Sequence, residues 1–261
     1  MRSLSIAATG LLAQQLNVEV ISNNIANMVT TGFKRQRPEF QDLLYQSQRR
    51  IGATSSDAGT VVPSGIQLGL GVRTASVYRI IEQGNLLGTG ATFDVAIQGR
   101  GWFRVQLPSG EDAFTRAGSF QLSPTGQVVT ADGDPVQPGI TIPNNALEIS
   151  INANGDVEVK IAGQVTPQNV GTFDLVSFPN AAGLEAIGDN LLLETPSSGA
   201  PVVGTPGNDG LGTLVQGFLE TSNVNSVSEI TNLITAQRAY EMNSKVVTTS
   251  DEMMATVSQL R

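Results

Sequence analysis

The sequence predicts an α+β protein with a helix at each end and a β-rich, mostly antiparallel region between them. Both ends carry apolar residues three or four positions apart, a spacing that places them on one face of a helix. The region between the ends consists of short apolar runs separated by turn signals such as Asn-Gly, which is typical of antiparallel strands. An apolar stripe on a helix needs a partner, so we expect the two terminal helices to pair with each other.

The first helix is expected over residues 3–28. It should end near Met28, because Val-Thr-Thr-Gly follows and Gly32 suits a turn or a left-handed position. Arg2 and the apolar run after it faintly resemble a signal peptide, but polar residues from Gln14 onwards continue the helix, so an amphipathic helix is the better interpretation. The helix seam, meaning the stripe that would face a partner helix, is predicted at Leu4, Leu11, Val18, Ile21 and Ile25.

Residues 31–70 are expected to connect this helix to the β region. Pro38 breaks any simple helix, although a short one could start there. Residues 46–70 are poor in large apolar groups and rich in Ser, Gly and Thr, which predicts an extended arm or a loop.

Residues 71–225 are predicted to form the β-rich domain, as a compact sandwich or barrel. Pro108-Ser109-Gly110, Thr125-Gly126 and Asn154-Gly155 each separate two strand-like runs. Aromatic residues are only 5% of the chain, so the core is expected to depend on Val, Leu, Ile and Ala.

The last helix is expected to begin after a cap at Asn225 or Ser226, with Glu229 placed as in a capping box, and to run to about Gln259. Residues 1–30 and 226–261 are predicted to pair as a coiled-coil-like domain. Polar residues such as Gln14 and Gln237 interrupt the stripes, which suits a seam that sets register. The predicted seam of the last helix is Val227, Ile230, Ile234, Tyr240, Val247, Met254 and Val257.

Composition excludes several functions. The chain has no Cys and no His, so Ser-His-Asp and Cys-His nucleophiles and His- or Cys-ligated zinc are impossible. The net charge of −8 without a basic stripe argues against nucleic-acid binding. No run of 18 apolar residues exists, so no membrane insertion is expected.

No catalytic, cofactor-binding or metal site is predicted. Gly99-Arg100-Gly101 is followed by strand-like sequence rather than a helix, so it is interpreted as a tight β turn and not as a phosphate cradle. Residues 152–158 have oxygen side chains at close spacing, but a hairpin turn explains them better than a calcium loop does. Nothing in the sequence brings two of the carboxylates of Asp94, Glu111 and Asp112 into one cleft.

Two long motifs carry a resemblance to a known family. Residues 22–36, SNNIANMVTTGFKRQ, closely resemble the N-terminal motif of the bacterial flagellar rod and hook axial proteins, and residues 220–254, beginning ETSNVNSVSEITNL, resemble their C-terminal motif. The middle agrees in the stretches GNLLGTGATFDVAIQGRGWFRVQLPSG and AFTRAGSF. These stretches and the total length are similar to the distal rod members rather than to the longer hook protein. One departure is Met28, where the family usually has Val.

The resemblance implies a subunit that polymerises helically into the distal rod of the basal body, the drive shaft between motor and hook. It implies export through the flagellar type III apparatus without a cleaved signal peptide. Its partners would be copies of itself, proximal rod proteins, the hook protein and the surrounding ring proteins. It also links residues 46–66 to a straight, stiff polymer.

The residues that match the family's assembly motif are Asn23, Asn24, Ile25, Asn27, Gly32, Phe33, Lys34, Asn223, Asn225, Gln237, Arg238, Tyr240 and Asn243. We expect Asn23, Asn24 and Asn27 to fix the exit of the first helix and its contacts with neighbours, the plainer alternative being simple capping. Another rod or hook protein of the same family is the nearest alternative function. A secreted β-domain enzyme or glycan-binding module is a remote one.

Overall fold

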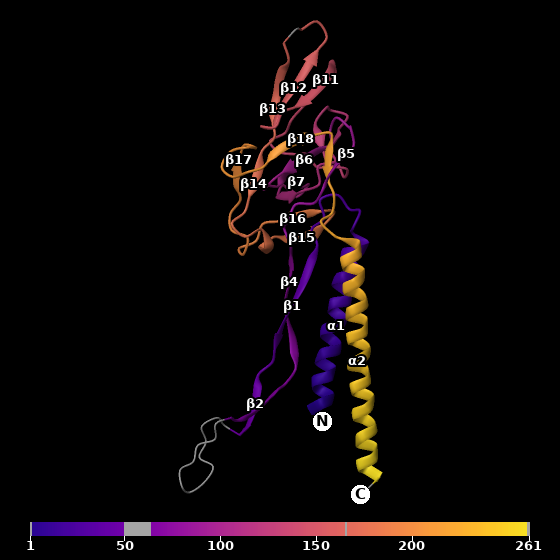
Figure 1. Ribbon diagram of the computed structural model, residues 1–261. Coiled ribbons are helices and arrows are strands. Elements are labelled where there is room, and N and C mark those ends of the chain that lie inside the picture. Colours follow the sequence, from indigo (N-terminus) through magenta and orange to yellow (C-terminus); the bar gives the residue numbers. More distant parts are fainter. Residues whose placement is uncertain (1, 50–63, 165, 260–261) are drawn as a thin grey trace. The chain divides into compact units, whose positions relative to one another are not determined.

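A computed structural model describes residues 2–49, 64–164 and 166–259, and it confirms the order of a helix, a β-rich antiparallel region and a second helix (Figure 1). The chain divides into two compact units, each assembled from segments that are distant in the sequence. Unit 1 comprises Met1–Ile25, Gln36–Tyr78 and Ser226–Arg261, and unit 2 comprises Ala26–Arg35 and Arg79–Asn225.

Helix α1 covers Arg2–Ala26 and therefore ends slightly before the predicted Met28. Beyond it, the Thr30 N–H donates to the Asn27 carbonyl at 3.2 Å. Gly32 then adopts a φ of 70°, the left-handed conformation that the sequence predicted. A Cβ at this position would lie 2.7 Å from the Ala117 nitrogen, so only glycine fits here.

Helix α2 covers Ser226–Gln259, as predicted. Its 34 residues span about 51 Å at about 1.5 Å per residue. Two contacts join it to α1 within unit 1. Asn24 Nδ2 donates to Glu229 Oε2 at 3.4 Å, and a Cβ built on Gly10 would lie 3.0 Å from Asn243 Nδ2. Both of these contacts involve small or polar residues.

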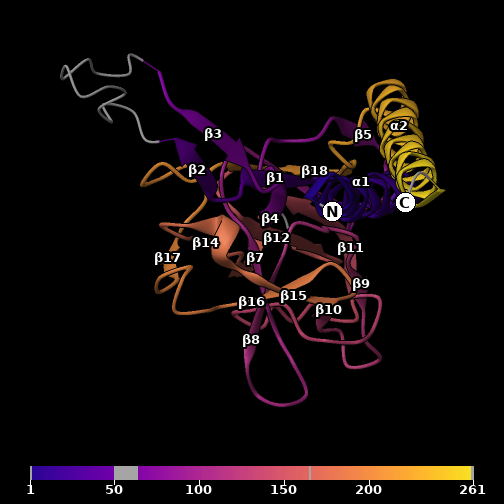
Figure 2. The ribbon, with the colours of Figure 1, turned by 90° about the horizontal axis from the view of Figure 1, so that it is seen from below.

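The strands of unit 1 add detail that the sequence did not predict. Residues around Pro38 form strand β1 (Gln36–Asp42), which pairs with β4 (Val72–Arg79), and not a short helix. β2 (Tyr45–Arg49) and β3 (Ile66–Gly69) lie side by side as an antiparallel ribbon (Figure 2), where a plain arm or loop was expected. Backbone pairing with a distant partner, which local sequence does not reveal, outweighs the weak strand propensity of these residues. Residues 50–63 of the predicted rod-type segment lie outside the described residues.

Helix α1 also bears on the membrane prediction. By length and overall composition it could cross a membrane, although it contains no unbroken run of 18 apolar residues. A signal sequence or a helix of a soluble protein passes the same test, so this finding is weak.

Unit 2 is built from small antiparallel sheets rather than one sandwich or barrel. One sheet has four strands in the order β15-β16-β8-β7, and one has three in the order β11-β12-β13; the others described are pairs, β10-β9, β14-β17, β18-β6 and β19-β5. A short 3₁₀ helix, η1, covers Ala181–Gly183. The strand bounds are β5 Leu86–Gly88, β6 Val95–Gln98, β7 Phe103–Gln106, β8 Asp112–Thr115, β9 Gln121–Leu122, β10 Val128–Val129, β11 Ala146–Ile151, β12 Asp156–Ile161, β13 Gln168–Thr172, β14 Leu175–Ser177, β15 Glu185–Gly188, β16 Leu191–Leu193, β17 Val202–Gly204, β18 Thr213–Gln216 and β19 Phe218–Glu220.

The three predicted turns are confirmed as hairpin connections. Pro108-Ser109-Gly110 joins β7 to β8, Thr125-Gly126 joins β9 to β10, and Asn154-Gly155 joins β11 to β12. Ile151 pairs with Val157 across the last of these turns. The interpretation of residues 152–158 as a hairpin is therefore confirmed.

The core of unit 2 consists mainly of Val, Ile, Leu and Ala, as the composition predicted, and it also contains several aromatic side chains. Phe103, Phe114 and Phe173 are among its largest fully buried side chains, together with Val, Ile and Leu. Phe103 contacts Phe120 edge-on, with ring centroids 5.0 Å apart. Edge-to-face contacts between such rings add to the stabilisation that comes from burying their surface.

Candidate assembly site

A buried cluster of charges holds the N-terminal motif against β19 inside unit 2. Lys34 Nζ donates to Glu220 Oε1 at 2.5 Å, and the Arg116 guanidinium donates to Oε2 at 2.6 Å through Nη2 and at 2.8 Å through Nε. The Gly84 N–H also donates to Oε1 at 2.9 Å. Glu220 is 1% exposed, and Lys34 and Arg116 are 5% exposed. A buried carboxylate is tolerable only with such partners, so Glu220 fixes several segments at once.

The electrostatics of the cluster fit a structural role. Lys34 Nζ also donates to the Glu82 carbonyl at 2.7 Å. Burial lowers the pKa of Lys34, and the positive charge of Arg116 lowers it further, while Glu220 opposes both effects. Both carboxylate oxygens of Glu220 are occupied by donors. Such a cluster can hold segments together, but it offers no free acid or base for proton transfer.

Asn223 bonds two further segments of unit 2 through its side chain. Its Oδ1 accepts from the Arg35 N–H at 2.7 Å, and its Nδ2 donates to the carbonyls of Ile80 at 2.9 Å and Glu82 at 3.1 Å. Its backbone N–H donates to the carbonyl of Phe33 at 3.4 Å, and the Gly32 N–H donates to the carbonyl of Glu220 at 2.8 Å. The N-terminal and C-terminal motifs therefore meet in unit 2.

Asn24 plays a similar part in unit 1. Its Nδ2 donates to the Gln36 carbonyl and its Oδ1 accepts from the Gln36 N–H, both at 2.8 Å. The side chain is 1% exposed, so its amide acts like one more peptide group at the start of β1. Nearby, Asn27 Oδ1 accepts from Thr30 Oγ1 at 3.1 Å. These contacts support the expectation that the asparagines fix the helix exit; contacts with neighbours stay a prediction.

The other predicted motif residues are less enclosed. Ile25, Phe33 and Asn243 are half-buried, whereas Asn23, Asn225, Gln237, Arg238 and Tyr240 are exposed. Asn23 and Asn225 each take part in interactions within the chain. Within a single chain, the exposed side chains remain available to a neighbour.

The predicted seam is placed unevenly. On α1, Ile21 is buried and Leu4, Leu11, Val18 and Ile25 are half-buried. On α2, Val247 and Met254 are half-buried, but the remaining predicted residues are between 44% and 73% exposed: Val227, Ile230, Ile234, Tyr240 and Val257. The covered face of α2 follows Glu229, Leu233, Ala236, Asn243, Val247, Ser250 and Met254 instead.

Several large apolar residues of α2 lie outside this covered face, spread over roughly half of the helix circumference by the 3.6-residue helix period. We call them the exposed stripe: Val227, Ile230, Ile234, Met242, Val246, Met253 and Val257. An apolar stripe of this length on one helix needs a partner that the single chain does not provide.

Sequence reasoning missed Glu220 and Arg116 as site residues. Both lie inside motifs that carry the family resemblance, Glu220 at the start of ETSN and Arg116 in AFTRAGSF. A signal was therefore present, but nothing local shows that these two side chains meet Lys34. Among the described residues, no group of three or more Asp and Glu side chains is arranged to hold a metal ion.

Family models match this chain in three places. The flagella basal body rod protein model matches residues 4–34, the D1 domain model of flagellar hook protein FlgE/F/G matches residues 96–159, and the C-terminal model of flagellar basal body rod FlgEFG protein matches residues 215–260. These regions contain the motif asparagines, Lys34, Arg116 and Glu220. The chain has a helix at each end, and its N-terminal and C-terminal motifs meet in unit 2. Together with the family matches, these features define an axial protein of the bacterial flagellum.

Full-length relatives narrow the class to one family. The flagellar basal-body rod protein FlgG of Caulobacter vibrioides is 60% identical over 261 residues, covering 100% of both chains, and that of Buchnera aphidicola subsp. Schizaphis graminum is 52% identical over 258 residues, covering 99% of both. The chain belongs to the FlgG family of flagellar basal-body rod proteins. A crystal structure of the Helicobacter pylori flagellar hook protein FlgE2 is 15% identical, with a TM-score of 0.25 and coverage of 72% of this chain and 43% of that one, a likeness too low to carry an argument.

Proposed function

We propose that this chain is a structural subunit that polymerises helically into the distal rod of the bacterial flagellar basal body and transmits torque from motor to hook. Membership of the FlgG family supports a rod subunit in the basal body, and rod proteins of this family are structural proteins rather than enzymes. The observation that carries polymerisation is α2, which has 34 residues and buries only three of them in the single chain.

The exposed stripe gives this polymer a bonding surface. A surface that meets a different surface on the next copy, without closing into a ring, generates a helical filament. We infer that α1 and α2 pair in a coiled-coil-like manner and that the exposed stripe packs on neighbouring copies. The contacts Asn24–Glu229 and Gly10–Asn243 support the pairing.

The proposal divides the chain by role. Residues 1–30 with 226–261 form the bonding domain, residues 31–70 a connection, and residues 71–225 the β-rich outer domain. Residues 46–66 are proposed to contact neighbours and resist bending. The part of this connection that is described supports the idea, because Leu44, Tyr45, Ile66 and Leu68 are all more than 40% exposed.

Family membership supports assembly with other flagellar axial proteins. The more specific partners belong to the proposal: proximal rod proteins, the hook protein, the surrounding rings and the type III export apparatus. Another rod or hook role is less favoured, because relatives that are 60% and 52% identical over nearly the whole chain are named FlgG.

Electron microscopy of the concentrated protein tests the bonding surface. The unchanged chain should form filaments, and the double variant Ile230→Glu/Ile234→Glu should not, because it places two charges in the exposed stripe where apolar contact is proposed. Asn232→Glu is the matched control: it adds a charge to the same helix at an exposed position outside the stripe. Normal filaments from the double variant would contradict the proposed surface.

A further inference from the structure

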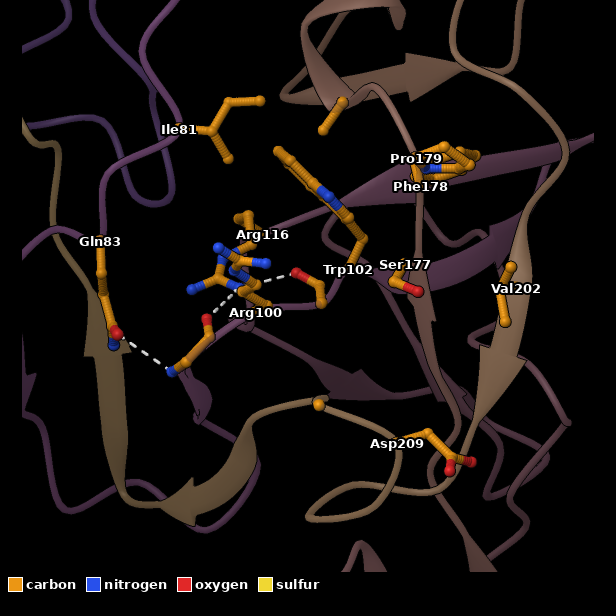
Figure 3. A pocket seen from close by; sticks show the side chains of 14 residues that line it. Ile81, Gln83, Arg100, Trp102, Arg116, Ser177, Phe178, Pro179, Val202 and Asp209 are labelled. Carbon is orange, nitrogen blue, oxygen red and sulfur yellow. Dashed lines mark hydrogen bonds between the residues drawn. The ribbon is translucent and has the colours of Figure 1, made fainter.

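Unit 2 contains a cavity that the proposed rod function does not use. Its volume is about 660 Å³, and its lining comes from the turn before β7, from β14 and the segment after it, and from the loop before β18. Figure 3 shows Arg100, Arg116 and Trp102 beside one another, with Ser177, Phe178 and Val202 to one side of them. This size lies within the usual range for ligand pockets, roughly 300–1,000 Å³.

The turn that carries Arg100 is held rigidly. Gly99 and Gly101 have φ angles of 115° and 137°, and the Arg116 guanidinium donates to the carbonyls of both, at 2.9 Å and 2.7 Å. The Gly212 N–H donates to the carbonyl of Arg100 at 2.7 Å. All three carbonyls of the turn are therefore bonded, so the backbone under the Arg100 side chain is fixed in advance, which lowers the entropic cost of binding a ligand.

Several polar groups in the lining are unpaired among the described residues. The side chains of Arg100, Ser177 and Asp209 take part in no hydrogen bond or ion pair there. The Trp102 indole N–H has no acceptor either, although the residue is only 5% exposed. Among the described residues, Arg104 Nε is the one side-chain polar atom that has neither a partner nor contact with solvent. The Trp102 indole N–H also has no partner, so it must be accessible from the cavity. The indole N–H and the exposed Arg100 guanidinium are thus two donors that an acceptor entering the cavity could bind without breaking an existing hydrogen bond.

The unpaired donors fit a carboxylate. A guanidinium binds a carboxylate through two parallel hydrogen bonds, and the indole N–H can supply another donor. Arg116 cannot compete for the ligand, because its donors are committed to Glu220 and to backbone carbonyls. A dianionic phosphate fits less well, since Arg100 is the one unpaired cation of the lining and the unpaired carboxylate of Asp209 lies in the same cavity.

The rest of the lining fits a peptide. Phe178, Pro179 and Val202 offer apolar surface for aliphatic side chains. Val202 lies on β17, which pairs with β14. Val202 and Val203 on this strand are 56% and 47% exposed. An extended segment lying in the cavity could therefore place aliphatic side chains on Phe178 and Val202 while its acidic side chain reaches Arg100.

We propose that this cavity is a docking site for an extended segment of a partner protein that carries a Glu or Asp flanked by aliphatic residues. The carboxylate binds Arg100 and the Trp102 indole N–H, and the flanking residues pack against Phe178 and Val202. This docking site does not involve α2. An experiment that contradicts peptide binding would therefore leave the proposed polymerisation through α2 unaffected, and the reverse also holds.

The chain has a single tryptophan, so its fluorescence reports on this cavity alone. The probes are the peptides acetyl-Val-Thr-Glu-Thr-Val-amide and its Gln counterpart, titrated into the dilute full-length chain. The Glu peptide should change the Trp102 emission saturably and bind roughly tenfold or more tightly than the Gln peptide, the usual effect of one charge-assisted hydrogen bond.

Arg100→Gln should abolish this preference, and Arg37→Gln, which removes an exposed arginine of unit 1, should keep it. Arg100→Gln should keep the emission maximum and thermal midpoint of the unchanged chain, because the Arg100 side chain has no partner to lose. Equal affinity for the two peptides, no binding up to ~10 mM, or a preference that survives Arg100→Gln would overturn the proposal. Displacement of the Glu peptide by inorganic phosphate of equal or higher affinity would overturn it in favour of a small-oxyanion site.

Discussion

At the scale of single residues, Glu220 is the position where one substitution should cost most. It is buried and accepts from Lys34, Arg116 and the Gly84 N–H. Glu220→Gln leaves two buried cations without their counter-charge, and breaking a buried pair in this way typically costs about 3–5 kcal/mol of unfolding free energy. Denaturant unfolding followed by Trp102 fluorescence measures the loss, because Trp102 belongs to the same unit.

The matched control is Glu148→Gln. Glu148 pairs with Lys160 at 3.9 Å, but the two side chains are 74% and 54% exposed. Solvent screens such a pair, so the change in unfolding free energy should stay within about 0.5 kcal/mol. If Glu220→Gln and Glu148→Gln lowered the free energy of unfolding by the same amount, the Glu220 cluster would not hold unit 2 together.

Lys34 makes stability depend on pH. Burial lowers its pKa in the folded chain below the ordinary value of 10.5. Between the two pKa values the unfolded chain binds more protons, so the free energy of unfolding rises with pH. This contribution of Lys34 to the free energy of unfolding is complete above pH 10.5, and it is lost as the pH falls through the pKa of Lys34 in the folded chain. The unchanged chain should therefore gain stability over Lys34→Met as the pH approaches 10.5, measured by denaturant unfolding of both; a difference that does not change with pH would contradict this.

At the scale of helices and strands, elements set by local sequence could be predicted, whereas elements set by pairing with a distant segment could not. The two helices and the three hairpins could be predicted, because helix period and turn residues act within a few positions. β1 and the β2–β3 ribbon could not, because their partners lie far along the chain. The same limit applies to the site, where Asn24 and Lys34 were predicted but their partners Gln36 and Glu220 were not.

The ribbon leads to a prediction about residues 46–66. Ile66 and Leu68 alternate along β3 on one face, and both are exposed in the single chain. If neighbouring copies cover this face, replacing residues 46–66 by a Gly-Ser linker of equal length should give a more curved or flexible filament. Chain length is unchanged in this variant, so a change in the filament comes from the loss of the ribbon and its side chains and not from a shorter connection. Electron microscopy measures the curvature, and a filament as straight as the original would count against the proposed role.

At the scale of the whole molecule, the two units should differ in stability when the chain is alone. The core of unit 2 consists of two clusters of buried residues, many of them with no exposure, whereas α1 and α2 together bury few side chains. Isolated helices are marginal in water unless an apolar face is packed, so the ends should be largely disordered in the monomer and become ordered on assembly.

Limited proteolysis in dilute solution tests this difference. Protease should trim both ends first and spare roughly residues 71–222. The cluster of Lys34 and Glu220 sharpens the expectation, because it predicts that residues 26–35 stay bound to the resistant fragment even after cleavage elsewhere. Glu220→Gln should release that segment sooner. Mass spectrometry of the fragments over time gives the order of cleavage. Under assembly conditions the same ends should become resistant, since the exposed stripe would then be covered; ends as resistant as the middle in the dilute monomer would mean that the helices fold without neighbours.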